Sequence, residues 1–380
     1  MAPFVAILLF LPFLAAGFTA AAAPPPSKCY TSLFSFGDSA TATGIQKTDN
    51  TPGTTAPHCA FPPYGESFFH KPTGRCSDGR TIVDFLSQYL RLPLLPPYWG
   101  ETIPAAANAT KNPYSHGANL AVVSATALDS NETGGASGCR NCSLSVQINR
   151  FKTLINSLHP TSAKRRAYLK KSLILLGEIG GVDYQRASFR NTTTSQSQVE
   201  SLIPLVTKRI GAVIEDLIEF GAVNFVVPGD FPKGCFPSYL TKFQSSNQSD
   251  YDPTTGCLVY HNWFSARHNK LLKKEIERIR KLHRHVSVRY ADYFSTGIRM
   301  HRNPEKYGIV KATMNKACCG AGGPYNYNPA AVCGRVGAVA CGNPKAYIKW
   351  DDHHYTEAAN RVIAGAVFKR RFQYRTACRN

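Results

Sequence analysis

A serine stands at the end of a short apolar run near the start of the chain. Leu33–Phe36 predicts a buried strand, and Gly37-Asp38-Ser39 follows as a turn. Because functional sites of open α/β sheets lie beyond the carboxyl ends of strands, Ser39 is placed where a nucleophile could act. The segment is not a G-x-S-x-G elbow, and on its own it favours an ordinary turn.

A carboxylate and two histidines lie far along the chain, in the segment 350–356 before a predicted helix. Asp351 and His354 are three residues apart, so the carboxylate can bond one imidazole nitrogen and leave the other free as a base. The alternatives are a helix N-cap for Asp351 and a surface or metal-binding histidine for His353 or His354.

The elements that must position these residues alternate between strand and helix. Strands are expected at 172–176, 224–227 and 286–290, and helices at 199–220, 263–283 and 356–369. This alternation predicts an α/β protein with a mostly parallel sheet covered by helices on both faces. Segments 46–80, 91–116, 229–257 and 317–345 are expected to be loops and insertions.

Length and composition describe an ordinary globular chain. It has 380 residues, 43% of them hydrophobic and 18% charged, which excludes disorder, collagen and coiled coil. Length alone allows two to three domains, but no linker divides the chain, so we expect a single domain over 27–375.

The N-terminus and the cysteines indicate an oxidising compartment. Residues 1–23 resemble a secretory signal peptide cut in the Ala20–Ala23 run, with a membrane anchor as the alternative, although no Lys or Arg precedes Lys28. Twelve cysteines allow six disulfides. Cys139-x-x-Cys142 has no partner pair that would complete a zinc site, so we expect no metal and no cofactor. Five sequons are candidate glycosylation sites: Asn108, Asn131, Asn141, Asn191 and Asn247.

The charge balance is strongly basic, with 44 Lys and Arg against 24 Asp and Glu and a net charge of +20. Basic residues gather at 164–166, 170–171, 273–289 and 369–371. For a secreted monomer this favours a solvated basic surface or binding to acidic wall polysaccharide. No nucleic-acid motif and no further apolar stretch long enough to span a membrane is present.

Taken together and in order, several blocks resemble the plant secreted branch of the GDSL (SGNH) esterase/lipase family. They are F-S-F-G-D-S (34–39), H-G-A-N-L-A-V (116–122), G-E-I-G-G-V-D-Y (177–184), V-V-P-G-D-F-P-K-G-C-F-P (226–237), C-C-G (318–320) and W-D-D-H-H-Y-T (350–356). The resemblance covers about residues 27–370. It implies a three-layer α/β/α flavodoxin-like sandwich and hydrolysis of carboxylic esters through an acyl-enzyme.

The resemblance also implies roles for individual residues. Ser39 would be the nucleophile, His354 the general base and Asp351 its orienting partner, since His354 rather than His353 fits the D-x-x-H pattern. The family's oxyanion hole uses the nucleophile's backbone N–H, the backbone N–H of a glycine in the second block and an asparagine side chain in the third.

The sequence departs from this pattern in the oxyanion hole. Ser124 stands at the glycine position and would be strained by a positive φ, while Val182 stands at the asparagine position and has no donor. Losing one oxyanion donor costs roughly 10²–10³ in kcat. Ala42, where aspartate is frequent, is a lesser departure.

Three hypotheses follow. The chain is an esterase with a weakened oxyanion hole, an acyltransferase that uses the same acyl-enzyme, or a non-catalytic binding protein on the same fold. The retained Ser39, Asp351 and His354 favour an enzyme. Candidate substrates are acetylated wall polysaccharides, small acylated metabolites and lipid esters.

Overall fold

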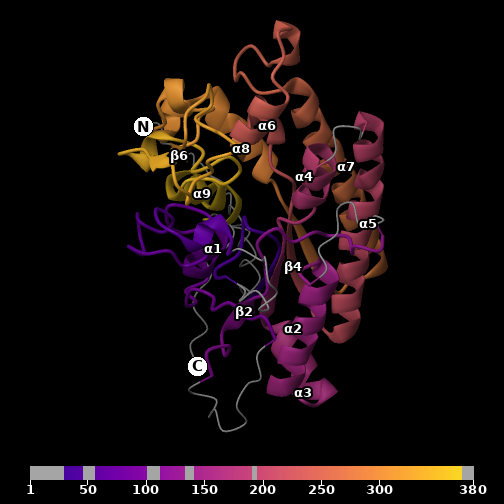
Figure 1. The fold of residues 1–380 in the computed structure, drawn as a ribbon. Coiled ribbons are helices and arrows are strands. Elements are labelled where there is room, and N and C mark those ends of the chain that lie inside the picture. The colour runs from indigo at the N-terminus through magenta and orange to yellow at the C-terminus, as the bar shows by residue number, and fades with distance from the viewer. Residues whose placement is uncertain (1–29, 46–55, 101–111, 133–140, 191–194, 370–380) are drawn as a thin grey trace, which may run out of the picture.

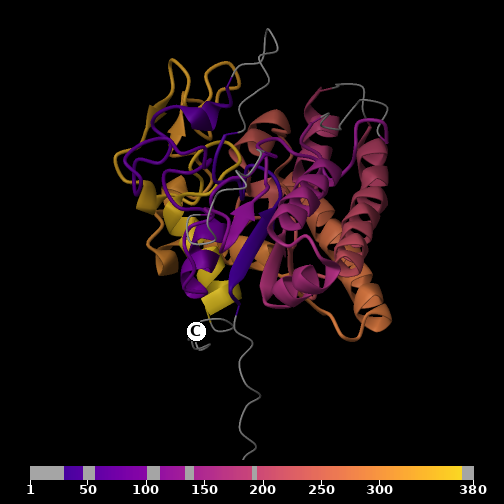
Figure 2. The ribbon, with the colours of Figure 1, turned by 90° about the horizontal axis from the view of Figure 1, so that it is seen from below.

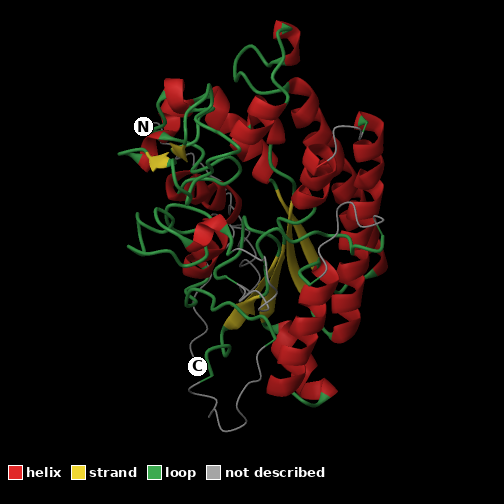
Figure 3. Cartoon of the chain, viewed as in Figure 1, coloured by secondary structure: helices red, strands yellow, loops and turns green. Residues whose placement is uncertain are grey.

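A five-stranded parallel sheet forms the centre of the computed structural model, which describes residues 30–45, 56–100, 112–132, 141–190 and 195–369 (Figure 3). The strand order is β2-β1-β3-β4-β5, and every pairing is parallel. The strands are β1 (Ser32–Phe36), β2 (Gly117–Asn119), β3 (Ser172–Leu176), β4 (Asn224–Pro228) and β5 (Ser287–Ala291). The predicted α/β class with a parallel central sheet is confirmed.

Helices cover both faces of the sheet (Figure 1). Their bounds are α1 (Ile82–Tyr89), α2 (Leu144–Leu158), α3 (Ser162–Lys170), α4 (Gly181–Arg190), α5 (Gln196–Phe220), α6 (Pro237–Lys242), α7 (Val259–Leu282), α8 (Tyr293–Arg302) and α9 (Glu357–Ala364). The described chain therefore has three layers, as an α/β/α sandwich requires.

Alternation along the buried strands divides the core into two clusters, one on each face. In β3, Ile174 packs in the cluster that receives α2, α5 and α7, while Leu175 packs in the cluster that receives α1, α8 and α9. Because successive strand side chains point to opposite faces, a strand buried on both sides is apolar throughout, as residues 173–176 are. Figure 2 shows the N-terminal indigo and C-terminal yellow segments together on one side, where α1 contacts α9.

Two sequence expectations need correction. The helix expected at 356–369 is shorter, because Thr356 caps α9 and a π-helical turn, Gly365–Lys369, follows Ala364. The loop expected at 229–257 contains α6, which begins at Pro237, a residue suited to the first helical position. The longer α5 ends as expected, at Gly221 with a left-handed φ of 118°.

Disulfide bonds pin the loops that the sequence left irregular. The pairs with both cysteines in the described segments are Cys59–Cys76, Cys235–Cys257, Cys318–Cys341 and Cys319–Cys333. The last two hold the segment that contains the small hairpin of β6 (Cys319–Gly320) and β7 (Val339–Ala340). Backbone hydrogen bonds fix this segment against the residues that precede Asp351. Cys318 N donates to Lys349 O, and Cys319 N donates to Trp350 O.

Candidate active site

The carboxyl ends of β1, β2, β3 and β4 open onto one cavity. Ser39 follows β1, Ser124 follows β2, Val182 follows β3 and Lys233 follows β4, and all four line the cavity. Since β1 lies between β2 and β3, segments from two neighbouring strands flank the serine. The edge is where parallel sheets place their functional residues.

The turn after β1 is built to hold Ser39 in place. Gly37 has a φ of +146°, and a Cβ there would lie 2.6 Å from Glu178 O, so only glycine fits. The buried Gln147 side chain accepts from Gly37 N at 2.9 Å and donates to Gly37 O at 2.9 Å. Asp38 Oδ1 accepts from Ala40 N at 2.9 Å, which ties the turn on the other side of the serine.

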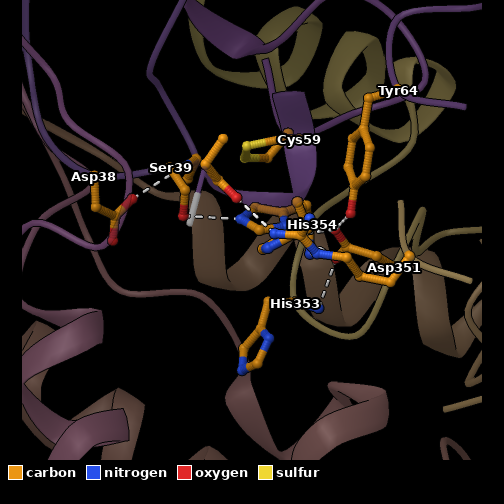
Figure 4. The surroundings of a disulfide bond; sticks show 12 residues. Asp38, Ser39, Cys59, Tyr64, Asp351, His353 and His354 are labelled. Carbon is orange, nitrogen blue, oxygen red and sulfur yellow. Dashed lines mark hydrogen bonds and ion pairs between the residues drawn. A yellow bond between two sulfur atoms is a disulfide. The ribbon is translucent and has the colours of Figure 1, made fainter. Parts of the chain in front are cut away.

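The segment before α9 presents His354 to this serine. Asp351 Oδ1 accepts from the backbone N of His354 at 2.7 Å, and His354 Nδ1 donates to Asp351 Oδ2 at 2.7 Å. A proton held on Nδ1 leaves Nε2 as the acceptor, and Ser39 Oγ lies 2.8 Å from that atom. Figure 4 shows Ser39, His354 and Asp351 in one line. Thr356, not Asp351, is the helix N-cap.

The electrostatics around Asp351 and His354 favour a charged carboxylate and a basic imidazole. Burial alone would raise the pKa of Asp351, but His354 and its hydrogen bonds outweigh burial and hold that pKa well below its ordinary value. Burial alone would lower the pKa of His354, but Asp351 outweighs it and raises that pKa above its ordinary value. Tyr64, which is fully buried, donates its hydroxyl to Asp351 Oδ2 at 2.7 Å.

His353 belongs to a second, separate chain of hydrogen bonds. Its Nδ1 lies 2.6 Å from Asp352 Oδ2, and its Nε2 lies 2.7 Å from Gln185 Nε2 and 3.0 Å from Ser238 Oγ. In Figure 4 its ring extends away from Ser39. The structure thus separates the two adjacent histidines and places only His354 against the serine.

Three buried carboxyl groups line the cavity. Burial raises the pKa of Asp38 to about 6. Burial, and then the nearby Asp38, raise the pKa of Glu178 well above its ordinary value. The third carboxyl, Asp230, forms an ion pair with Lys233. Aromatic rings complete the wall: Phe231, Phe236, Tyr239 and Tyr355.

The two residues predicted at oxyanion-hole positions, Ser124 and Val182, line the same cavity as Ser39. Ser124 has a φ of 64°, so the position does require the left-handed conformation that glycine adopts freely. Val182 is buried in the first turn of α4. Asp183 joins the two segments, because its carboxylate accepts from Ala127 N at 2.8 Å and Leu128 N at 3.1 Å. It therefore shapes the loop, as its place beside Val182 predicts.

The other candidate residues are placed as follows. Asn131, Asn141 and Asn247 are exposed, whereas Asn108 and Asn191 lie outside the described residues. Among the described residues, the one set of ligand-bearing side chains without a disulfide cysteine is His58, Asp351 and His354, with ligand atoms within 4.8 Å of one another. Two of those three already share a hydrogen bond.

Three contacts had no signal in the sequence. Tyr64 lies in a segment expected to be a loop, and Gln147 and Gln185 lie in helices that were not expected. Each of the three is at least 110 residues from the group named here, so a pattern along the chain does not show these contacts. They depend on the tertiary fold.

A serine, an imidazole and a buried carboxylate lie together at the carboxyl edge of the parallel sheet, an arrangement typical of hydrolases. The family described as GDSL-like Lipase/Acylhydrolase matches residues 33–367, so the chain belongs to this family of hydrolases that act on ester bonds. A sinapine esterase of Brassica napus is 44% identical over 368 residues, 95% of this chain and 91% of that protein. A GDSL esterase/lipase of Arabidopsis thaliana is 43% identical over 349 residues, 90% of this chain and 85% of that protein.

None of the helices in the described segments has the length and hydropathy needed to cross a bilayer.

Proposed function

We propose that this protein is a secreted esterase that hydrolyses small carboxylic esters with Ser39 as nucleophile, His354 as general base and Asp351 as the orienting carboxylate. The observation that carries the proposal is the 2.8 Å contact between Ser39 Oγ and His354 Nε2, with Asp351 behind the same ring. A serine hydroxyl is a weak nucleophile until an adjacent base takes its proton, and this geometry supplies that base.

The reaction proceeds in two halves. Ser39 Oγ attacks the ester carbonyl carbon while His354 Nε2 takes the hydroxyl proton, and the same proton then goes to the leaving alcohol as the C–O bond breaks. Water attacks the resulting acyl-enzyme with His354 again as base, and the acid leaves as the proton returns to Ser39. Asp351 stabilises the imidazolium in both halves and stays ionised.

The oxyanion that forms in each half needs hydrogen-bond donors. We assign the backbone N–H groups of Ser39 and Ser124 to this role, since both residues line the cavity. Ser124 keeps a backbone donor in the left-handed conformation, so the change from glycine preserves the group that matters. Val182 removes a side-chain donor, and the hole is altered at that position.

We infer that the protein reaches the cell wall. The resemblance of residues 1–23 to a signal peptide, the sequons and the disulfide-pinned loops support this inference. The mature chain would be one domain over 27–375. The exposed Asn131, Asn141 and Asn247 are the glycan acceptors within the described residues, and a mass decrease on enzymatic deglycosylation of secreted protein would test them.

The substrate class follows from the cavity and from one relative. The cavity wall combines polar groups with aromatic rings, and this combination fits a small ester with an apolar or aromatic part. The name of the Brassica relative, sinapine esterase, favours a small acylated metabolite over a polymer or a lipid.

Hydrolysis of short p-nitrophenyl esters tests the proposal. Wild-type protein should release p-nitrophenol and Ser39→Ala should lose this activity, whereas Ser201→Ala, an exposed serine on α5, should keep it. An added alcohol should leave the free acid as the main product. Equal hydrolysis by Ser39→Ala and wild type would refute the proposed nucleophile, and a dominant ester product would favour transacylation.

A further inference from the structure

Gln185 lies one helical turn after the position where the oxyanion donor is missing. Val182 and Gln185 are both in α4, three residues apart, and both line the cavity that contains Ser39 and His354. Residues three apart lie on the same face of a helix. A side-chain amide is therefore available beside Val182.

The direction of helical side chains brings this amide toward the vacant donor position. Cα–Cβ bonds tilt toward the N-terminus of a helix, so a residue covers the turn that precedes its own Cα. Gln185 accordingly extends over the first turn of α4, where Val182 is located. Glutamine has one methylene more than asparagine, which gives it the reach that a start one turn later requires.

A hydrogen-bond chain orients the amide group. Asp352 Oδ2 lies 2.6 Å from His353 Nδ1, so in the neutral ring the proton is on Nδ1 and Nε2 is an acceptor. Gln185 Nε2 is 2.7 Å from that acceptor and donates one of its two hydrogens to it. Ser238 Oγ donates to the Asp352 carbonyl oxygen at 3.1 Å and lies 3.0 Å from His353 Nε2.

We propose that the Gln185 amide donates its second hydrogen to the oxyanion in place of the missing asparagine, and that Asp352 and His353 are positioning residues for that amide. The two adjacent Asp-His pairs of residues 351–354 then have separate tasks. Asp351 and His354 serve the nucleophile, and Asp352 and His353 serve the oxyanion donor. This inference rests on the proposed esterase function.

A double-mutant cycle between Gln185 and Val182 tests the proposal. Gln185→Leu keeps the size and removes the donor, so kcat should fall by about 10²–10³ with KM changed by less than about threefold. Val182→Asn should raise kcat at least about tenfold in the Gln185→Leu background, where the added amide replaces the lost donor, and by a clearly smaller factor in the wild-type background. Gln88→Leu, an exposed glutamine on α1, is the matched control.

The positioning role has its own readout. His353→Phe and Asp352→Asn should lower kcat, and Val182→Asn should restore it in both, because the new amide needs neither His353 nor Asp352. A general structural defect would not be rescued by a donor added on α4. Thermal unfolding and circular dichroism of each variant verify that the proteins compared are folded.

Two results overturn the assignment alone: a kcat for Gln185→Leu within about threefold of wild type while hydrolysis depends on Ser39, or a lack of rescue by Val182→Asn. Hydrolysis retained in Ser39→Ala would instead overturn the proposed function, and this assignment with it. The Ser39→Ala control therefore separates the two failures.

Discussion

The substitution Tyr64→Phe removes the hydroxyl that donates to Asp351, the carboxylate that orients the proposed base His354. The Tyr64 ring is fully buried and packs edge-on against Trp350 at 5.9 Å between centroids, so phenylalanine keeps this packing. What is lost is the 2.7 Å hydrogen bond to Asp351 Oδ2. The carboxylate remains bonded to His354 through Nδ1 and through the backbone N.

The magnitude follows from the charge on the acceptor. A hydrogen bond to a charged group contributes about 1.5–3 kcal/mol, so the free energy of unfolding should fall by about that amount. Since one pKa unit corresponds to about 1.36 kcal/mol, the pKa of Asp351 should rise by about one to two units. It starts well below its ordinary value, so the group stays ionised at neutral pH. The less solvated carboxylate attracts the imidazolium proton more strongly, and the pKa of His354 should rise.

Two assays measure these effects. Denaturant unfolding gives the stability difference, and the pH profile of kcat/KM gives the pKa of the free enzyme's base, whose acidic limb should move to higher pH. Tyr307→Phe, at a half-buried tyrosine in the turn Pro304–Tyr307, is the control. Stability within about 0.5 kcal/mol of wild type together with an unmoved limb would refute the role given to Tyr64.

Two further predictions concern the Asp351–His354 pair. His354 must be neutral to accept a proton, and its pKa is raised, so kcat/KM should fall as the pH falls through a limb above about pH 6.5. A limb at or below pH ~6.5 in both wild type and Asp38→Asn would contradict the assignment of His354 as the base. Asp38→Asn is the control because Asp38, with a pKa of about 6, titrates nearby. Asp351→Asn should lower kcat by about 10⁴, because the amide no longer holds the proton on Nδ1; a loss below about tenfold in steady-state hydrolysis would show that another group orients the ring.

Four strands of the sheet (β1, β3, β4 and β5) and the helices α5 and α7 could be predicted because each carries its own local signal, whereas α2 was not predicted. Residues 172–176 are apolar throughout because β3 is buried on both faces, and α5 shows helical spacing followed by Gly221. β2 has only Gly117–Asn119, which is too short for a periodic pattern, and α3 is almost wholly exposed. β2 owes its conformation to its pairing with β1, and an exposed helix such as α3 carries no apolar stripe, so the sequence alone did not indicate either element.

The residues of the candidate site also fall into those with a local sequence signal and those without one. Ser39, Asp351 and His354 could be named because two short motifs carry them, although 315 residues separate the serine from the histidine. Tyr64, Gln147 and Gln185 could not, because each contacts the site across a large interval of chain and no local pattern marks it. Ser124 was only partly predictable. The motif indicated the position at which a positive φ would strain a serine, and the structure shows that φ there is 64°.

Labelling of the purified protein by a fluorophosphonate, with the adduct located by peptide mass spectrometry, tests the central claim most directly. The account predicts one adduct per chain, on Ser39, formed at a rate that drops sharply in His354→Ala. Folded protein that takes up no probe, or an adduct on a different serine, would contradict it.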